Sequence, residues 1–375
     1  MKLFDVYPLY DIEIARACGS RVYDKNGVEY LDMYGGHAVI SIGHTNEHYV
    51  KRLNEQLAKI GFYSNSVIIP QQKELADLLG KLTGKDDYQL FLCNSGAEAN
   101  ENAMKLASFA TGRKKIVAFR GSFHGRTSLA VAATDNAAIV APANETSNVI
   151  FLPFNNIEAL KALFAECGTE VAAVITEAIQ GVGGIRIANN EFLKTIRTLC
   201  DVYGAKFIAD GVQDGCGRTG NYFAHDSAGI KADIYTMAKG IGNGFPLAGL
   251  LISPDLKPKY GMLGTTFGGN HLACTAGIAV AEEMLAKDMV KNAAQMGEYL
   301  IGELSKLQNI KEVRGKGLMI GIELNEDYKW LRDKLLYTHK IFVGTAGKTI
   351  IRLLPALNIT KEDCDRTIAA FKAEL

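Results

Sequence analysis

The sequence predicts an α/β fold with a large, doubly wound, mostly parallel sheet and a smaller α+β domain that follows it. Apolar runs that suit strands alternate with amphipathic stretches that suit helices from about residue 88 to residue 252. The run at 171–176 is apolar or β-branched throughout, which is typical of a central parallel strand buried on both faces. In such a fold, ligands bind at the carboxyl ends of the strands.

Composition places the chain among globular proteins. Its 375 residues are enough for two domains, 48% of them are hydrophobic, and the formal net charge is zero, so neither nucleic acid nor an anionic membrane is an expected partner. The first residues lack the apolar core of a signal peptide, and no apolar run is long enough to span a bilayer. Seven scattered cysteines without CxxC spacing, and no HExxH, predict a reduced cytoplasmic protein without a metal.

The first predicted elements lie before the large sheet. Residues 21–32 read as a hairpin, because two β-type runs flank the turn Asn26-Gly27. Glycines beside Tyr34 and His37 predict a loop that approaches a ligand closely, although capping or packing explains a histidine equally well. A helix is expected from Pro70, with Gly84 as its end.

The first strand of the large sheet, at 88–93, runs into a turn of small residues. Ser95, Gly96 and Ala97 open a helix, and the free backbone N–H groups there suit an anion such as phosphate. An ordinary helix cap made by Asn94 or Ser95 is the competing interpretation.

A second strand, at 115–119, delivers the loop 121–127. Phe123 in this loop can stack on a planar ligand, and Arg126 can bind a carboxylate. The alternative is a surface loop whose phenylalanine belongs to the core.

Two further strands end in residues that carry chemistry. The strand at 206–210 ends in Asp210, and the next one, at 233–237, leads to Lys239, which glycines and a proline follow directly. A lysine in a desolvated pocket loses its proton more readily and can then attack a carbonyl. The competing interpretation is a solvated loop lysine.

The spacing Gly215-x-Gly217-x-x-Gly220 imitates a dinucleotide fingerprint. The residues after it do not predict a helix, and no acidic residue ends a following strand at the expected place. A nicotinamide-dependent oxidoreductase is therefore the weak rival from another class. A non-catalytic relic is excluded by the presence of Lys239 and Asp210.

Together these parts meet the requirements of pyridoxal 5′-phosphate. Lys239 would hold its aldehyde as a Schiff base, and Asp210 would keep its ring nitrogen protonated. Ser95, Gly96 and Ala97 would bind its phosphate.

The ring itself needs three more contacts. Phe123 would cover one face of the ring and Val212 the other. Gln213 would reach the ring hydroxyl. The order of all these parts along the chain is more specific than any one of them.

Several strings extend the pattern over nearly the whole chain. They are LCNSGAEANE at 92–101, GSFHGRT at 121–127, GRTG at 217–220, MAKG at 237–240, GTTFGGN at 264–270 and RLLP at 352–355. With them the chain resembles the class III, fold-type I aminotransferases, in particular the acetylornithine aminotransferase branch.

The resemblance implies roles for further residues. Arg126 matches the arginine that binds the α-carboxylate of acylated ornithine, and Arg352 matches the arginine that binds 2-oxoglutarate. Glu177 belongs to a string expected at the substrate site. Thr266 matches a threonine that reaches the phosphate bound by the neighbouring subunit, which implies a homodimer with shared active sites.

The resemblance also implies the reaction and the domains. The terminal amino group of an N2-acylated ornithine would pass to 2-oxoglutarate in arginine biosynthesis, with acetylornithine as the first choice and N-succinylornithine, ornithine or 4-aminobutyrate as alternatives. Residues 1–50 would join the small domain to the active-site edge, 51–270 would form the large domain that binds the cofactor, and 271–375 would form the small C-terminal domain.

Two departures from the family pattern bear on function. Val182 stands where the family usually has a glutamate that pairs with the arginine at Arg352, so Arg352 is expected to stay an unpaired cation. We expect this to favour substrates with an extra carboxylate. Gly211 stands where the family has glutamate, which makes the loop after Asp210 atypical.

Overall fold

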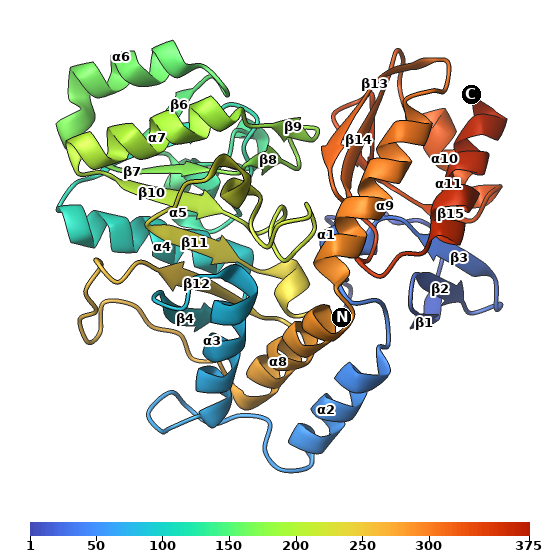
Figure 1. Cartoon of the computed structure of the whole chain (residues 1–375), viewed down its shortest axis with the longest axis horizontal. Coiled ribbons are helices and arrows are strands. Elements are labelled where there is room, and N and C mark those ends of the chain that lie inside the picture. The colour runs from blue at the N-terminus through green and yellow to red at the C-terminus, as the bar shows by residue number, and fades with distance from the viewer.

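The computed structural model describes residues 1–375 and contains a central seven-stranded sheet (Figure 1). Its strands, in spatial order, are β4 (Gln89–Cys93), β12 (Ala248–Ile252), β11 (Ile234–Met237), β10 (Lys206–Asp210), β7 (Val171–Thr176), β5 (Lys115–Phe119) and β6 (Val149–Leu152). Only β12 runs antiparallel to its neighbours. The predicted mostly parallel sheet is confirmed.

Helices cover both faces of this sheet, because both faces of its central strands are apolar. All six residues of β7 are buried. Val174 joins the buried cluster that contains side chains of α7 (Asn190–Tyr203), whereas Ile175 joins the cluster that contains those of α4 (Gly96–Thr111). The remaining helices around the sheet are α3 (Pro70–Thr83), α5 (Ser128–Ala132) and α6 (Ile157–Cys167).

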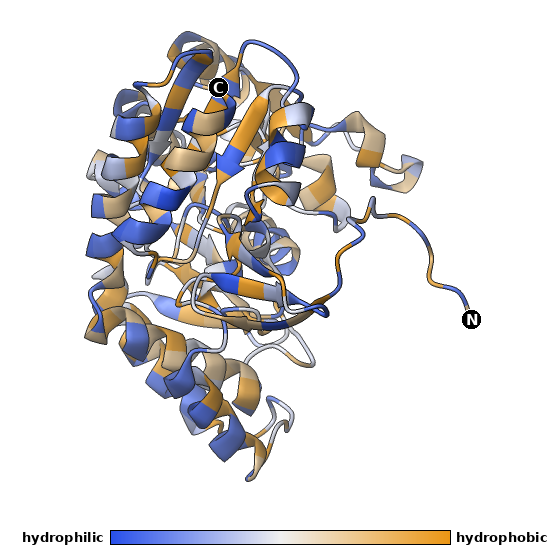
Figure 2. Cartoon of the chain, turned by 90° about the vertical axis from the view of Figure 1, so that its right-hand side faces the viewer, coloured by the Kyte–Doolittle hydropathy of each residue, from blue (hydrophilic) through white to orange (hydrophobic).

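A smaller α+β part lies beside the large sheet (Figure 1). Its antiparallel sheet contains β13 (Ile310–Lys316), β14 (Met319–Leu324), β17 (Ile350–Leu353) and β16 (Gly344–Ala346), in that order. Its helices are α9 (Met289–Leu304), α10 (Lys329–Tyr337) and α11 (Lys361–Glu374). Figure 2 shows hydrophilic and hydrophobic residues alternating along the helices, as expected for helices with one buried side.

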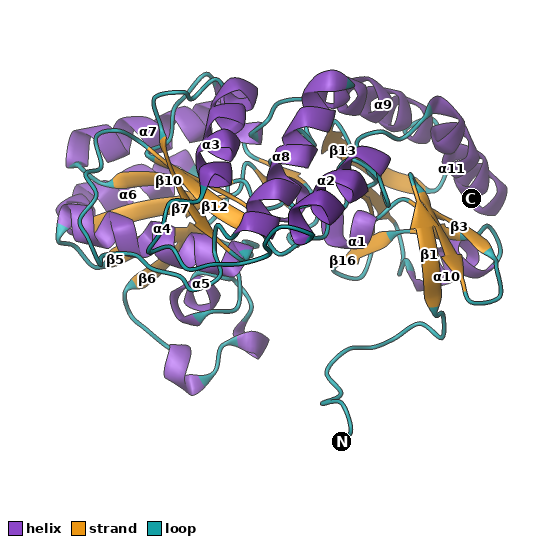
Figure 3. Cartoon of the chain, turned by 90° about the horizontal axis from the view of Figure 1, so that it is seen from below, coloured by secondary structure: helices purple, strands orange, loops and turns teal.

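The amino-terminal segment joins this smaller part through β-pairing. A second four-stranded sheet has the order β1 (Ile14–Cys18), β2 (Arg21–Asp24), β3 (Glu29–Asp32) and β15 (Ile341–Phe342). The predicted hairpin is therefore present as β2 and β3, which pair antiparallel. Figure 3 shows the residues before β1 extending away from the body of the molecule.

One helix connects the two parts along the chain. Helix α8 (His271–Ala286) is buried along most of its length and packs against α3 and α2 (Glu47–Leu57). The division of the chain into domains at residues 50 and 270 remains a proposal. The short elements α1 (Gly35–Ala38), β8 (Ile179–Gln180) and β9 (Arg186–Ile187) complete the fold. No helix has both the length and the apolar character required to cross a membrane.

Two local predictions can be compared directly with the structure. The helix expected from Pro70 begins there and ends at Gly84, whose φ of 64° is the left-handed conformation that glycine adopts easily. The segment 211–223 forms turns and leads into a 3₁₀ turn (Ala224–Ala228) instead of an α-helix. It therefore lacks the helix that a dinucleotide fingerprint requires.

Candidate active site

A cavity of about 440 Å³ lies at the carboxyl ends of the large sheet's strands, which is where the fold class predicts a ligand. The cavity brings together ten of the residues predicted for the site: Ser95, Gly96, Ala97, Phe123, Arg126, Glu177, Asp210, Val212, Gln213 and Lys239. Arg352 and Thr266 do not line it.

Lys239 follows β11 and begins a 3₁₀ turn (Lys239–Ile241). Its φ of 50° is left-handed, a conformation that costs a non-glycine residue energy and that occurs often at functional sites. Burial lowers the pKa of its ammonium, although Asp210 and Glu177 act in the opposite direction. The lowered pKa favours the neutral amine form of this side chain.

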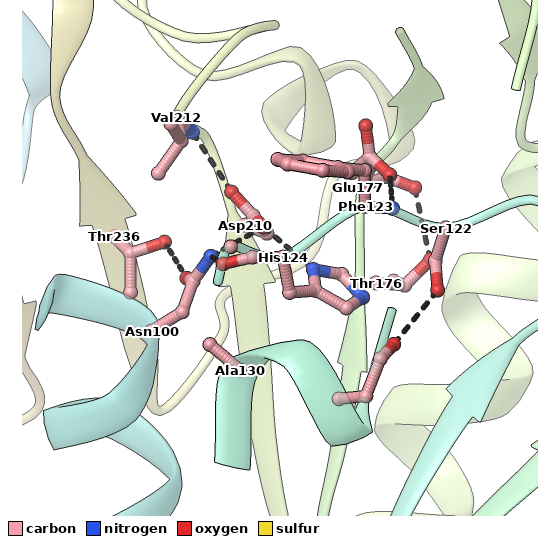
Figure 4. Close-up of polar contacts among 12 residues, drawn as sticks. Asn100, Ser122, Phe123, His124, Ala130, Thr176, Glu177, Asp210, Val212 and Thr236 are labelled. Atoms are coloured by element: carbon pink, nitrogen blue, oxygen red, sulfur yellow. Dashed lines mark hydrogen bonds and ion pairs between the residues drawn. The ribbon is translucent and has the colours of Figure 1, made fainter. Parts of the chain in front are cut away.

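Asp210 ends β10 and is only 2% exposed. Its Oδ2 accepts a hydrogen bond from Asn100 Nδ2 at 2.7 Å and interacts with His124 Nδ1 at 2.6 Å, and its Oδ1 accepts one from the Val212 amide at 2.9 Å (Figure 4). Burial alone would raise the pKa of Asp210, but the contact with His124, the Val212 amide and the charge of Lys239 together lower it. The carboxylate stays ionised as a result.

Asn100 and His124 were not assigned roles from the sequence. Asn100 also donates to the carbonyl of His124 at 2.8 Å and accepts from Thr236 Oγ1 at 2.7 Å, so it fixes the position of β11 relative to the loop 121–127. Asn100 is 1% exposed and lies on the apolar side of α4. A polar residue in an apolar helix stripe was the signal that could have identified it.

The amino-terminus of α4 fits the predicted anion site. Ser95 caps the helix by accepting from the Glu98 amide at 3.2 Å, while the amides of Gly96 and Ala97 belong to the first turn and have no acceptor within the helix. A Cβ on Gly96 would lie 2.6 Å from Val212 Cγ1, so only glycine leaves room at this wall. The capping and anion-site interpretations are therefore compatible.

Arg126 and Arg352 both lack a carboxylate partner. Arg126 is exposed, lines the cavity and makes no hydrogen bond or ion pair within the chain. Arg352 is 5% exposed and donates to three neutral oxygens: the Gly181 carbonyl at 3.0 Å, Gln213 Oε1 at 3.4 Å and the Tyr34 hydroxyl at 3.3 Å. Burial lowers the pKa of Arg352.

The loop that precedes α7 carries Glu177 and Val182. Val182 lines the cavity and is 48% exposed, so the position predicted to leave Arg352 without a carboxylate does face the ligand space. Glu177 is 5% exposed, and its two oxygens accept from the Phe123 and Gly181 amides at 3.0 Å each. Burial, with a further contribution from Asp210, raises the pKa of Glu177 to about 7.

The atypical loop after Asp210 is closely packed. A Cβ on Gly211 would lie 2.7 Å from the Phe223 ring and 2.9 Å from the Thr236 carbonyl, so no larger residue fits here without rearrangement. Asp214 is buried, accepts from the Ile179 amide at 2.8 Å through Oδ2, and leaves Oδ1 without a partner. Burial raises its pKa well above the usual range.

Thr266 is exposed on the loop between β12 and α8. Its neighbour Thr265 accepts from Asn94 Nδ2 at 3.3 Å and from the Gly268 amide at 3.1 Å, which ties this loop to the end of β4. Thr266 thus lies outside the cavity of its own chain.

Comparisons with known proteins agree with this geometry. A family model described as "Aminotransferase class-III" matches residues 5–375. A protein named acetylornithine aminotransferase from Archaeoglobus fulgidus is 42% identical over 369 residues, covering 98% of this chain and 96% of that protein. A crystal structure of an (S)-enantioselective omega-transaminase from Thermomicrobium roseum is 28% identical, has a TM-score of 0.90, and the match covers 99% of this chain and 95% of the other.

One structural relative is described with a cofactor. An amine transaminase from an uncultivated Pseudomonas species, in its PLP-bound form, is 25% identical with a TM-score of 0.89, and the match covers 97% of this chain and 94% of the other. The family match over nearly the full chain, together with a buried lysine and carboxylate at the ends of adjacent strands, leads to one conclusion: the chain belongs to the class III aminotransferases.

Proposed function

We propose that this chain transfers the terminal amino group of N2-acetylornithine to 2-oxoglutarate, giving N-acetylglutamate semialdehyde and glutamate, as a step of arginine biosynthesis. The observation that carries the proposal is one cavity lined by Lys239, Asp210 and Arg126. Arg352 lies beside it, donates to the cavity residue Gln213 and, like Arg126, has no carboxylate partner. The 42% identity with the Archaeoglobus fulgidus acetylornithine aminotransferase favours this substrate.

The residues of the cavity suit pyridoxal phosphate as cofactor. The first-turn amides of α4 would hold its phosphate, Asp210 would pair with its ring nitrogen, and Phe123 and Val212 would cover the ring. Gln213 would contact the ring hydroxyl. When bound, the cofactor supplies an electron sink for the electron pair left on the substrate carbon.

The chain's own residues manage the proton. Burial lowers the pKa of Lys239, so its Nζ would accept the proton from the substrate carbon that bears the amino group. The same Nζ would then donate this proton to the former aldehyde carbon of the cofactor. Asp210 remains charged throughout, because His124 and the Val212 amide stabilise its ionised form. The buried position of both groups excludes water, which strengthens the attraction between Asp210 and Lys239 once the lysine has accepted a proton.

The two arginines give the substrates their orientation. Arg126 would bind the α-carboxylate of the acylated ornithine, and Arg352 would bind 2-oxoglutarate through a carboxylate. Neutral oxygens bind only the two terminal nitrogens of Arg352, and its buried Nε has no partner, so an arriving carboxylate would meet a full positive charge.

N-succinylornithine is a second candidate substrate, and one observation favours it. Val182 faces the cavity, and no carboxylate of the chain forms an ion pair with Arg352. The extra carboxylate of a succinyl group would find an unpaired cation there. Equal kcat/KM for the two acylornithines, or a higher value for acetylornithine, would contradict this preference.

We also propose a homodimer with shared active sites. Large apolar side chains remain exposed near the loop that carries Thr266, including Phe62 at 43%, Ile68 at 91% and Phe267 at 60%. A partner chain would cover them and would receive Thr266 at its phosphate site. Sedimentation analysis of the holoprotein tests the dimer, and a monomer with full activity would refute it.

One experiment tests the substrate proposal. The absorbance of the bound cofactor is followed after mixing the holoprotein with acetylornithine, succinylornithine, ornithine or 4-aminobutyrate in separate reactions. We expect the highest kcat/KM with an acylated ornithine. A higher value with ornithine or 4-aminobutyrate would refute the proposal.

A further inference from the structure

Glu177 is a buried carboxylate whose oxygens are both bound by backbone. It directly follows β7, and its Oε1 accepts from the Phe123 amide at 3.0 Å (Figure 4), while its Oε2 accepts from the Gly181 amide at 3.0 Å. Each oxygen therefore holds a different loop of the cavity wall.

Both polar backbone atoms of Gly181 make hydrogen bonds to side chains. Its N–H donates to Glu177, and its carbonyl accepts from Arg352 Nη1 at 3.0 Å. A Cβ at this position would clash with Gln213 Oε1, so the space beside Gly181 on that side is already filled. The position of Glu177 is thus transmitted to Arg352 through the backbone of one residue, Gly181.

We propose that Glu177 is a positioning residue that couples the ring-covering Phe123 to the substrate-binding Arg352 through the backbone. Its side chain holds the Phe123 loop with one oxygen and the Arg352-binding peptide with the other. The inference rests on the proposed function, which gives Phe123 and Arg352 their roles.

The residue type at this position follows from the two donors. Two N–H groups that point at one side chain need two acceptor oxygens, and only a carboxylate provides them. A glutamine would satisfy one amide and present its own NH₂ donor to the other. The chain retains the carboxylate even though burial beside Asp210 disfavours its charge.

The test uses Glu177→Gln in the full chain. We measure the dissociation constant of pyridoxal phosphate for the protein freed of cofactor, and that of glutarate, a dicarboxylate probe, for the holoprotein by calorimetry. Both dissociation constants should rise, by up to about tenfold, because one amide loses its acceptor and the other bonds a neutral oxygen in place of a charged one.

Glu101→Gln is the matched control. Glu101 also accepts two backbone amides, those of Leu129 at 3.0 Å and Ala130 at 2.9 Å, but it does not line the cavity. Both dissociation constants should stay within about twofold of those of the parent chain. The Glu101 carboxylate holds the Thr127 hydroxyl and the first amides of α5, and it contacts neither Phe123 nor Gly181.

A second substitution separates the effect of Glu177 on cofactor binding from its effect on glutarate binding. In an Arg352→Gln background, adding Glu177→Gln should still weaken cofactor binding but should leave the remaining glutarate affinity unchanged. If Glu177→Gln fails to fold, Glu177→Ala replaces it, because alanine removes the acceptors of both the Phe123 and the Gly181 amide. The same two shifts are then expected.

The coupling is refuted if the substitution weakens cofactor binding alone, glutarate binding alone or neither. The proposed function fails independently of this result if the unsubstituted holoprotein transfers no amino group from an acylated ornithine while both binding shifts are present.

Discussion

Asp210 and Arg352 are both buried and charged, but the chain matches their charges in different ways. Asp210 is held by the Asn100 amide, the Val212 amide and His124. Arg352 meets only neutral oxygens, and no carboxylate forms an ion pair with it. The chain thus stabilises the buried carboxylate with its own groups and leaves the buried guanidinium without an ion pair, as expected if Arg352 binds substrate carboxylates.

The largest effect is expected at Lys239, which lines the same cavity as Asp210. Lys239→Ala removes the only cavity lysine, so turnover should fall by about 10⁴-fold or more, the upper range for loss of an acid-base group. The absorbance of the lysine-bound cofactor should disappear as well. Lys257→Ala, on an exposed loop, is the control, and retained turnover in Lys239→Ala would end the proposal.

Asp210→Asn tests the buried carboxylate that groups of the chain itself stabilise. The amide keeps the shape of the carboxylate but removes the negative charge that would hold the ring nitrogen protonated. We expect kcat to fall by about 10²-fold to 10³-fold, as for the loss of a preorganised charge. Stopped-flow measurement of each half-reaction checks the value. A decrease below threefold would contradict the role given to Asp210.

Arg126→Gln and Arg352→Gln test the two arginines that have no carboxylate partner within the chain. Removing the charge-assisted hydrogen bonds that Arg352 would donate to a substrate carboxylate should raise the KM for 2-oxoglutarate by about 10-fold to 100-fold, with a much smaller change for acylornithine. Arg126→Gln should raise the KM for acylornithine instead. If either variant changes both constants equally, the two arginines do not divide the substrates as proposed.

Val182→Glu would give Arg352 a carboxylate partner from the chain itself. A carboxylate next to Gly181, whose carbonyl contacts Arg352, should pair with that guanidinium and weaken binding of substrates with an extra carboxylate. The ratio of kcat/KM for succinylornithine to that for acetylornithine should fall about tenfold. Val182→Gln, which has similar size without charge, is the control and should leave the ratio within about twofold.

The smallest effect concerns Asp214, a buried acid on the loop that follows Asp210. Its pKa is raised in the folded chain, so its contribution to stability is complete below the pKa of the unfolded chain and is lost as the pH rises toward the folded value. Asp214→Asn should therefore match the parent chain near pH 4 and unfold at higher urea concentration near pH 8. Equal urea midpoints at both pH values would contradict the raised pKa.

The sequence predicted most of the large sheet but fewer of the other elements. The strand at 115–119 and the strand at 206–210 have the bounds expected from their apolar runs. No prediction was made for α2 or α6, nor for β13, β15 and β16. Residues 310–316, for example, are mostly polar and partly exposed in β13, so their pairing with β14 decides the conformation rather than a hydrophobic pattern.

The sequence by itself determined most of the residues that meet at the cavity, because the parallel strands of one sheet bring their carboxyl ends to the same edge. That rule places Ser95, Asp210 and Lys239 together without any knowledge of distances. Only the tertiary structure decided how the charges are matched. The oxygens around Arg352 come from Tyr34, Gly181 and Gln213, which lie 318, 171 and 139 positions away in the chain. No local spacing encodes interactions of that range, since they arise when separate loops pack around one side chain.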